Sequence, residues 1–155
     1  MWGWDARGMH SIVLRARSSF PPKWTLCTLE RMDTTITAIT LFTDDLPATK
    51  QFYIDAFELT VHYEDEVSAV FDFGNTLINL LETAEGVSLI DPAAVAPASA
   101  GARMQLTITV DDVDAVCSRL QSRGVTLLNG PMDRPWGIRT ASFMDPAGHI
   151  WEIAH

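Results

Sequence analysis

Two stretches of the chain match without gaps: TLFTDDLPA at residues 40–48 and TITVDDVDA at residues 107–115, an offset of 67 residues. Each begins with the apolar–polar alternation of a half-buried strand, continues with Asp-Asp, and then takes up helical spacing. A short carboxylate accepts hydrogen bonds from the free amides of a first helical turn, so Asp44 and Asp111 are the expected N-caps. The repeat predicts one supersecondary unit written twice.

The two expected helices are placed at about residues 46–57 and 113–123, and strand patterns follow each of them. In the first copy they are ELTVHYED, SAVFDFG and TLINLLE; in the second they are VTLLNG, IRTASFMD and HIWEIA. Turn residues separate them, most clearly DPAG at residues 145–148. The sequence therefore predicts an α+β fold of two tandem βαβββ modules, forming a cupped, mostly antiparallel sheet around a cavity. Neither module is large enough to bury a sufficient core alone, so the two should pack together.

Residues 1–31 have a different composition from the rest of the chain. They carry a balance of +3, whereas the whole chain of 155 residues has a formal net charge of −9. We expect a poorly ordered basic extension over residues 1–31 and one domain over residues 32–155. That domain divides into a module at 34–85, an Ala/Pro-rich linker at 86–102 and a module at 103–155.

Bulk properties limit the partners. A pI of about 4.7 argues against nucleic acid or an anionic membrane surface, because both attract clustered positive charge. No apolar run approaches the roughly 18 residues that span a bilayer. Two distant cysteines, Cys27 and Cys117, suggest no disulfide framework. A cytoplasmic protein is the expectation.

Strand alternation assigns the faces of the first strand in each module. Leu106 and Ile108 share the parity of Ile39 and Leu41, and should pack under a helix. The opposite parity holds two matching rows, which should line the cavity on the open side: Ala38, Thr40 and Phe42 in the first module, and Gln105, Thr107 and Thr109 in the second.

Three segments carry a family resemblance: ITLFTDDLPATKQFY at residues 39–53, MQLTITVDDVDAV at 104–116, and RPWGIRTASFMDPAGHIWEIA at 134–154. They resemble the vicinal oxygen chelate (VOC) superfamily, which includes glyoxalase I, extradiol dioxygenases, fosfomycin-resistance enzymes and bleomycin-binding proteins. Trp136-Gly137 followed by DPAG and Glu152 is closest in look to the bleomycin-resistance-like branch. The resemblance implies the module pair described above and, commonly, a homodimer.

Metal-dependent members of that superfamily place His, Gln or Glu ligands on the first and last strands of each module. Carried over by resemblance, these positions are Ala38, Asn79, Gln105 and Glu152. Ala38 has no donor atom and Asn79 and Gln105 are neutral amides, so we expect no metal and no cofactor. His149 has the opposite strand parity to Glu152, and His62 is expected to be a solvated surface residue.

Three other residues are candidates for a ligand site. Glu152 could bind a ligand hydroxyl or cation, or act as a catalytic general base if burial raised its pKa. Trp136 is read either as a stacking platform for a planar ligand or as a packed loop anchor. Arg139 is expected to pair with Glu152 or with an anionic substrate.

These expectations leave three functions open. The first is a metal-free protein that binds a small organic molecule, as antibiotic- or toxin-resistance members do by sequestration. The second is an enzyme, either a metal-dependent lyase, isomerase or dioxygenase with an unusual site or a metal-free catalyst that uses Glu152. The third is a domain with a vestigial groove that binds a partner.

Overall fold

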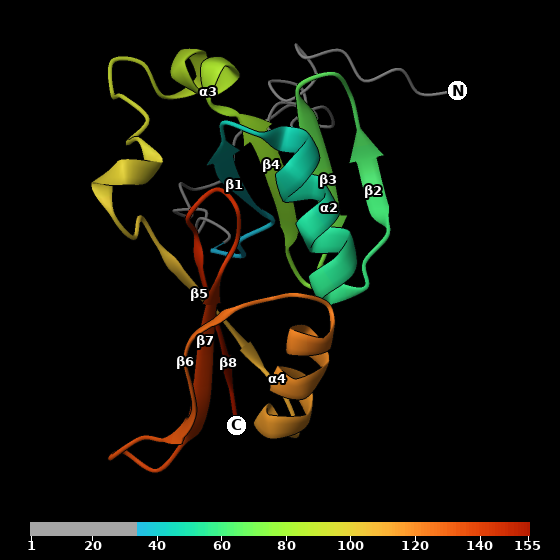
Figure 1. Cartoon of the computed structure of the whole chain (residues 1–155). Helices are drawn as coiled ribbons and strands as arrows, with labels where there is room; N and C mark the ends of the chain where they lie inside the picture. Colours follow the sequence, from blue (N-terminus) through green and yellow to red (C-terminus); the bar gives the residue numbers. More distant parts are fainter. Residues whose placement is uncertain (1–33) are drawn as a thin grey trace, which may run out of the picture. The chain divides into compact units, whose positions relative to one another are not determined.

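Each copy of the repeat folds into a strand, a helix and three further strands (Figure 1) in a computed structural model that describes residues 34–155. The extension expected at residues 1–31 lies outside the described residues. The first module contains β1 (Ala38–Thr43), α2 (Leu46–Phe57), β2 (Val61–Glu64), β3 (Ser68–Asp72) and β4 (Leu77–Glu82). The second contains β5 (Gln105–Thr109), α4 (Val113–Ser122), β6 (Leu127–Asp133), β7 (Arg139–Met144) and β8 (Ile150–Ala154).

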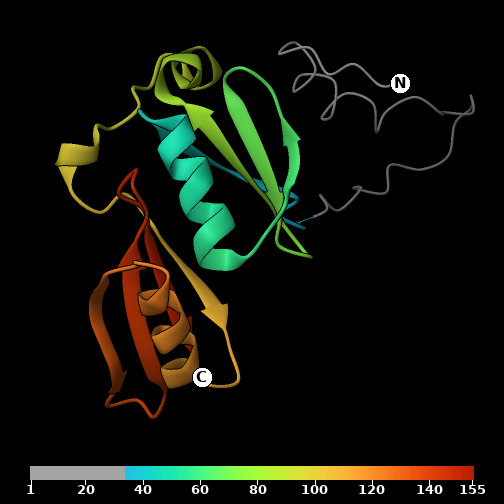
Figure 2. The same cartoon turned by 45° about the vertical axis from the view of Figure 1, so that its right-hand side comes forward.

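The eight strands form two four-stranded sheets of the same topology, β1-β4-β3-β2 and β5-β8-β7-β6. The first and last strands of each module pair in parallel, and every other pair is antiparallel. The expected α+β fold of two tandem βαβββ modules with mostly antiparallel pairing is confirmed, and the sheets do not close into a barrel. In each module the helix lies along one face of its sheet and leaves the other face open (Figure 2).

Both helices begin where the sequence predicted, at Leu46 and Val113, but their caps lie one residue later than expected. Asp45 caps α2 and accepts a hydrogen bond from the amide of Ala48, and Asp112 caps α4 in the same way through Ala115. The expected N-caps Asp44 and Asp111 were therefore wrong. Either Asp of an Asp-Asp pair has the chemistry of a cap, and the first residue to adopt helical dihedrals decides between them.

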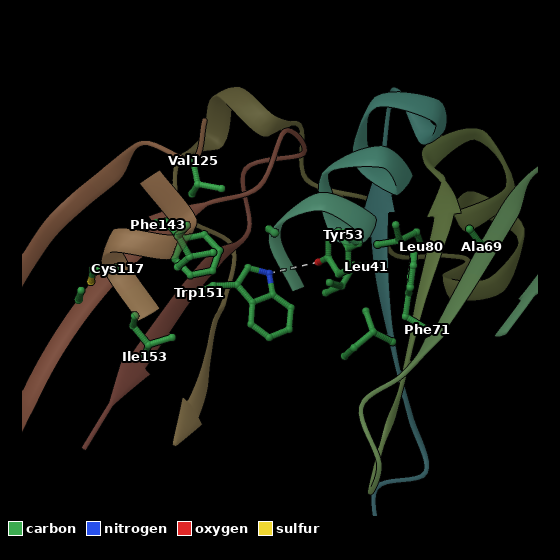
Figure 3. Close-up of a cluster of buried hydrophobic side chains, with 14 of the residues drawn as sticks. Leu41, Tyr53, Ala69, Phe71, Leu80, Cys117, Val125, Phe143, Trp151 and Ile153 are labelled. Atoms are coloured by element: carbon green, nitrogen blue, oxygen red, sulfur yellow. Dashed lines mark hydrogen bonds between the residues drawn. The ribbon is translucent and has the colours of Figure 1, made fainter. Parts of the chain in front are cut away.

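One hydrophobic core joins the two modules on the helix-facing sides of the sheets. It includes Leu41, Tyr53 and Phe71 of the first module and Phe143 and Trp151 of the second, all at most 2% exposed. The rings of Phe57 and Trp151 are 4.8 Å apart. The Trp151 indole donates to the Tyr53 hydroxyl at 3.2 Å (Figure 3). The expectation that the modules pack together is confirmed.

The segment between the modules contains a helix that the sequence did not suggest, α3 (Thr83–Ile90), and a short 3-10 turn, η2 (Ala98–Ala100). Gly86 of α3 lies so close to the ring of Phe42 that a Cβ there would approach it to 2.5 Å. The Arg103 guanidinium bonds the carbonyls of Ala96 and Phe42 at 3.1 and 3.3 Å, which fastens this segment to β1. None of the helices within residues 34–155 is long and apolar enough to cross a membrane.

Candidate functional site

A row of polar side chains crosses the open face of the second sheet. Strand register aligns one residue from each of its four strands: Thr107, Glu152, Ser142 and Asn129. The Thr107 hydroxyl donates to Glu152 Oε1 at 3.1 Å, which orients the carboxylate in the middle of the row. We call these four residues the second-module row. It holds hydrogen-bond donors, acceptors and one negative charge on a single face.

Arg134, from the hairpin between β6 and β7, reaches the same face. Its Nε donates to Thr140 Oγ1 at 2.7 Å, and a terminal nitrogen donates to Asn129 Oδ1 at 2.8 Å. Thr140 has the same strand parity as Ser142, so the guanidinium lies on the open side beside the row. Neither Arg134 nor Ser142 was expected from the sequence. The strand parity of Ser142 relative to Glu152 was a usable signal for that residue.

The corresponding row of the first module is less polar. It consists of Thr40, Asn79, Val70 and Tyr63, aligned across β1, β4, β3 and β2. Asn79 is 3% exposed, and its amide donates to the Thr40 hydroxyl at 3.4 Å. Phe42, expected to line the cavity, packs against α3 at Gly86.

The remaining predicted face residues lie on the same faces, two residues along the strand from these rows. Ala38 pairs with Leu77, Gln105 with Ile150 and Thr109 with Ala154. Ala38, Gln105 and Thr109 are all exposed. The structure thus brings Thr40 together with Asn79, and Thr107 together with Glu152.

Arg139 lies on the opposite side of the sheet from Glu152. Its guanidinium bonds both carboxylate oxygens of Asp114 on α4, at 2.6 and 2.8 Å, and Asp133 at 3.0 Å. The hydrogen bonds to Asp114 and then Asp133 raise the pKa of Arg139, and the guanidinium lowers the pKa of Asp114. The expected pairing of Arg139 with Glu152 is therefore wrong, because Arg139 shares the parity of the helix-facing residues Ala141 and Phe143. Trp136, near the hairpin tip, is 69% exposed.

The DPAG turn builds a buried connection between the modules rather than part of the open face. Asp145 accepts hydrogen bonds from the Tyr53 hydroxyl at 3.0 Å and from the backbone amide of His149 at 2.8 Å. The His149 ring nitrogen Nδ1 lies 3.0 Å from the same carboxylate, and both side chains are almost fully buried. Desolvation and the charge of Asp145 raise the pKa of Tyr53. As expected, His149 does not accompany Glu152, and His62 is exposed.

The donor atoms at the family's metal positions do not fit a divalent ion. Ala38 supplies none, Asn79 and Gln105 supply neutral amides, and the carboxylate of Glu152 is engaged by Thr107. Zinc, nickel and iron sites in proteins draw on imidazole and carboxylate ligands, of which this set has one. Within residues 34–155 no group of three or more His, Cys, Asp or Glu side chains is placed to hold an ion.

Comparisons with known proteins agree with this architecture. The sequence model of the Glyoxalase/Bleomycin resistance protein/Dioxygenase superfamily matches residues 35–153. The protein YraH of Bacillus subtilis strain 168 is 32% identical over 119 residues, which cover 74% of this chain and 93% of YraH.

Solved structures of low sequence identity share the fold. A glyoxalase/bleomycin resistance protein/dioxygenase from Nocardioides superposes with a TM-score of 0.71 at 22% identity, covering 95% of this chain and 92% of its own. A lactoylglutathione lyase from Agrobacterium tumefaciens gives a TM-score of 0.65 at 23% identity, covering 78% of this chain and 92% of the lyase.

Proposed function

The chain belongs to the glyoxalase/bleomycin resistance protein/dioxygenase superfamily, and from that premise we propose that its open sheet face binds a small organic molecule without a resident metal ion. The observation that carries the proposal is the second-module row. At the position where metal-dependent relatives supply a ligand, Glu152 is instead oriented by a hydrogen bond from Thr107. A face built in this way recognises polar groups of a ligand directly.

The charges on the face define the ligand further. Glu152 contributes a negative charge that attracts an amine or a hydroxyl donor, and Arg134 contributes a positive charge beside Asn129. A hydrogen bond to a charged group that a neighbour holds in place is stronger and more directional than a hydrogen bond between neutral groups. We propose that the ligand carries a donor group for Glu152 and that binding sequesters it, as in antibiotic or toxin resistance.

We also propose that the chain is a homodimer that shares its ligand faces. Met132 and Met144 lie in the open face of the second sheet and are 37% and 45% exposed. Apolar side chains gathered on one face favour cover by another surface. Sedimentation analysis of the full chain checks this proposal, and a monomer at all concentrations would contradict it.

Ligand screening of the full chain tests the binding proposal. A panel of amine-bearing aromatic and glycopeptide antibiotics is screened by thermal shift, and the hits are titrated by calorimetry. We expect Glu152→Gln to weaken each genuine hit about tenfold or more, because a hydrogen bond to a charged group contributes about 1.5–3 kcal/mol. Glu66→Gln, an exposed acid at the turn between β2 and β3, is the matched control and should leave affinity unchanged.

Turnover separates this proposal from the enzymatic alternative. If a hit is converted to product and Glu152→Gln abolishes the conversion while binding persists, the chain is an enzyme with Glu152 as its base. If the hits bind unchanged to Glu152→Gln, the open face of the second sheet is not the site and the proposal fails.

A further inference from the structure

A hollow of about 240 Å³ lies on the helix side of the second sheet, away from the open face. Its floor is apolar and comes from strands β5, β7 and β8, the inner side of α4 and the end of α2. The floor residues are Ala56, Phe57, Ile108, Val110, Val116, Leu120, Phe143 and Ile153. The hollow is slightly smaller than the roughly 300–1,000 Å³ of drug-sized pockets, so it suits a small molecule.

The rim of this hollow carries more positive than negative charge. Arg119 on α4 and Arg123 at the C-cap of that helix both line it, together with Glu58. Arg123 is committed to the Glu58 carboxylate and to the carbonyl of Asp55. The Arg119 guanidinium makes no hydrogen bond or ion pair with any residue in the part of the chain that the structure describes. The one side-chain hydrogen bond to this residue goes from the Ser122 hydroxyl to its backbone carbonyl, at 2.7 Å.

Arg119 is unusual among the cations of residues 34–155. Lys50 pairs with Glu64, Arg139 with Asp114 and Asp133, and Arg134 and Arg103 bond polar oxygens. An uncommitted guanidinium at the rim of an apolar floor matches a molecule with an apolar body and one anionic end.

We propose that this hollow is a binding site for small amphipathic monocarboxylates, with the apolar body on the floor and the carboxylate at Arg119. The site is separate from the open face, because Ile108 and Ile153 point to the opposite side of the sheet from Thr107 and Glu152. Aryl or short alkyl acids are the class that this volume and charge accept. A larger or dianionic ligand would meet Glu58 at the rim.

Methyl NMR of the full chain with phenylacetate as the probe tests the proposal. We expect saturable shifts at the methyl groups of Ile108, Val116 and Leu120. Phenylacetamide has the same shape without the charge, and should bind about tenfold more weakly. Arg119→Gln should weaken phenylacetate by a similar factor. Lys50→Gln makes the same change of charge away from the hollow and should have no effect.

The proposal is overturned by the absence of saturable shifts, by equal affinity for the acid and the amide, by an unchanged affinity in Arg119→Gln, or by shifts centred on the Thr107 methyl of the open face. Shifts at the methyl groups of the same three residues that depend on protein concentration without any probe would assign the hollow to a second copy of the chain. That result would also exclude the carboxylate.

Discussion

Tyr53 is the residue through which the first module meets the buried turn of the second. Its hydroxyl donates to Asp145 and accepts from the Trp151 indole, and its side chain is fully buried. Removing one partner from such a network leaves the others unsatisfied at a cost of about 1–3 kcal/mol each. The ring packs against Phe71 of its own module and against Trp151 of the second, so Tyr53 couples the two modules by both hydrogen bonding and ring contact.

The raised pKa of Tyr53 makes stability depend on alkaline pH. The unfolded phenol ionises near its ordinary value of 10.0, whereas the folded one holds its proton. The contribution of Tyr53 to the free energy of unfolding is therefore fully present below pH 10. It is lost as the pH rises further, by about 1.4 kcal/mol per pH unit. Urea unfolding from pH 9 to 11 should show this slope in the wild type and a clearly smaller one in Tyr53→Phe.

Tyr63, the other tyrosine, provides the control. It lies at the surface, so tyrosinate absorbance should report its ionisation in the folded protein, above the ordinary value because desolvation and the adjacent Asp65 raise its pKa. Tyr63→Phe should remove this absorbance change and keep the alkaline slope of stability. Ionisation of Tyr53 before unfolding would contradict the account.

At the scale of elements, the repeat uses matched helix starts. Asp45 and Asp112 occupy equivalent places and cap their helices with hydrogen bonds of 3.0 and 2.9 Å. The preceding residues, Asp44 and Asp111, are exposed and supply no cap. Each module therefore offers the same comparison between a capping Asp and the non-capping Asp before it.

Alanine substitutions should distinguish each capping Asp from the Asp that precedes it. Asp45→Ala and Asp112→Ala should each lower the free energy of unfolding by about 1 kcal/mol, the usual contribution of a side-chain cap. Asp44→Ala and Asp111→Ala should change it by less than about 0.5 kcal/mol. Urea denaturation of the four variants measures the difference, and equal losses within either pair would show that the caps are wrongly assigned.

The hairpin of β6 and β7 depends on Gly130. Its φ is +80°, and a Cβ would lie 2.5 Å from the Thr140 carbonyl oxygen and 2.7 Å from Ala141 Cα. Gly130→Ala should lower the free energy of unfolding by about 2–5 kcal/mol, from backbone strain and overpacking together. Gly74 has a φ of +90° with nothing within 4 Å, so Gly74→Ala should cost only the strain, about 1–2 kcal/mol. Equal losses in denaturation experiments would contradict the close approach.

At the scale of the whole molecule, the periodicity of apolar residues predicted both modules, because each copy shows strand alternation followed by helical spacing. The side of Arg139 was available from alternation, since it shares the parity of Ala141 and Phe143, but the expected pairing with Glu152 did not use that signal. Within the second-module row, Thr107 and Glu152 were predicted from the sequence. Asn129 was not, because irregular register around it decides which β6 residue faces Ser142. Helix α3 was not predicted from the sequence because it contains Gly86. A glycine stands there because a Cβ would clash with the ring of Phe42. Contacts between distant segments set these features, and local sequence does not encode them.

The metal content of the full chain tests the central claim, that the open face binds its ligand without an ion. Protein purified without chelator is dialysed against nickel, zinc, manganese and iron(II), and bound metal is measured before and after. We predict far less than one ion per chain under every condition, because Ala38, Asn79 and Gln105 add no charged donor to Glu152. About one ion per chain, lost in Glu152→Ala, would contradict the account and assign the face to metal-dependent chemistry.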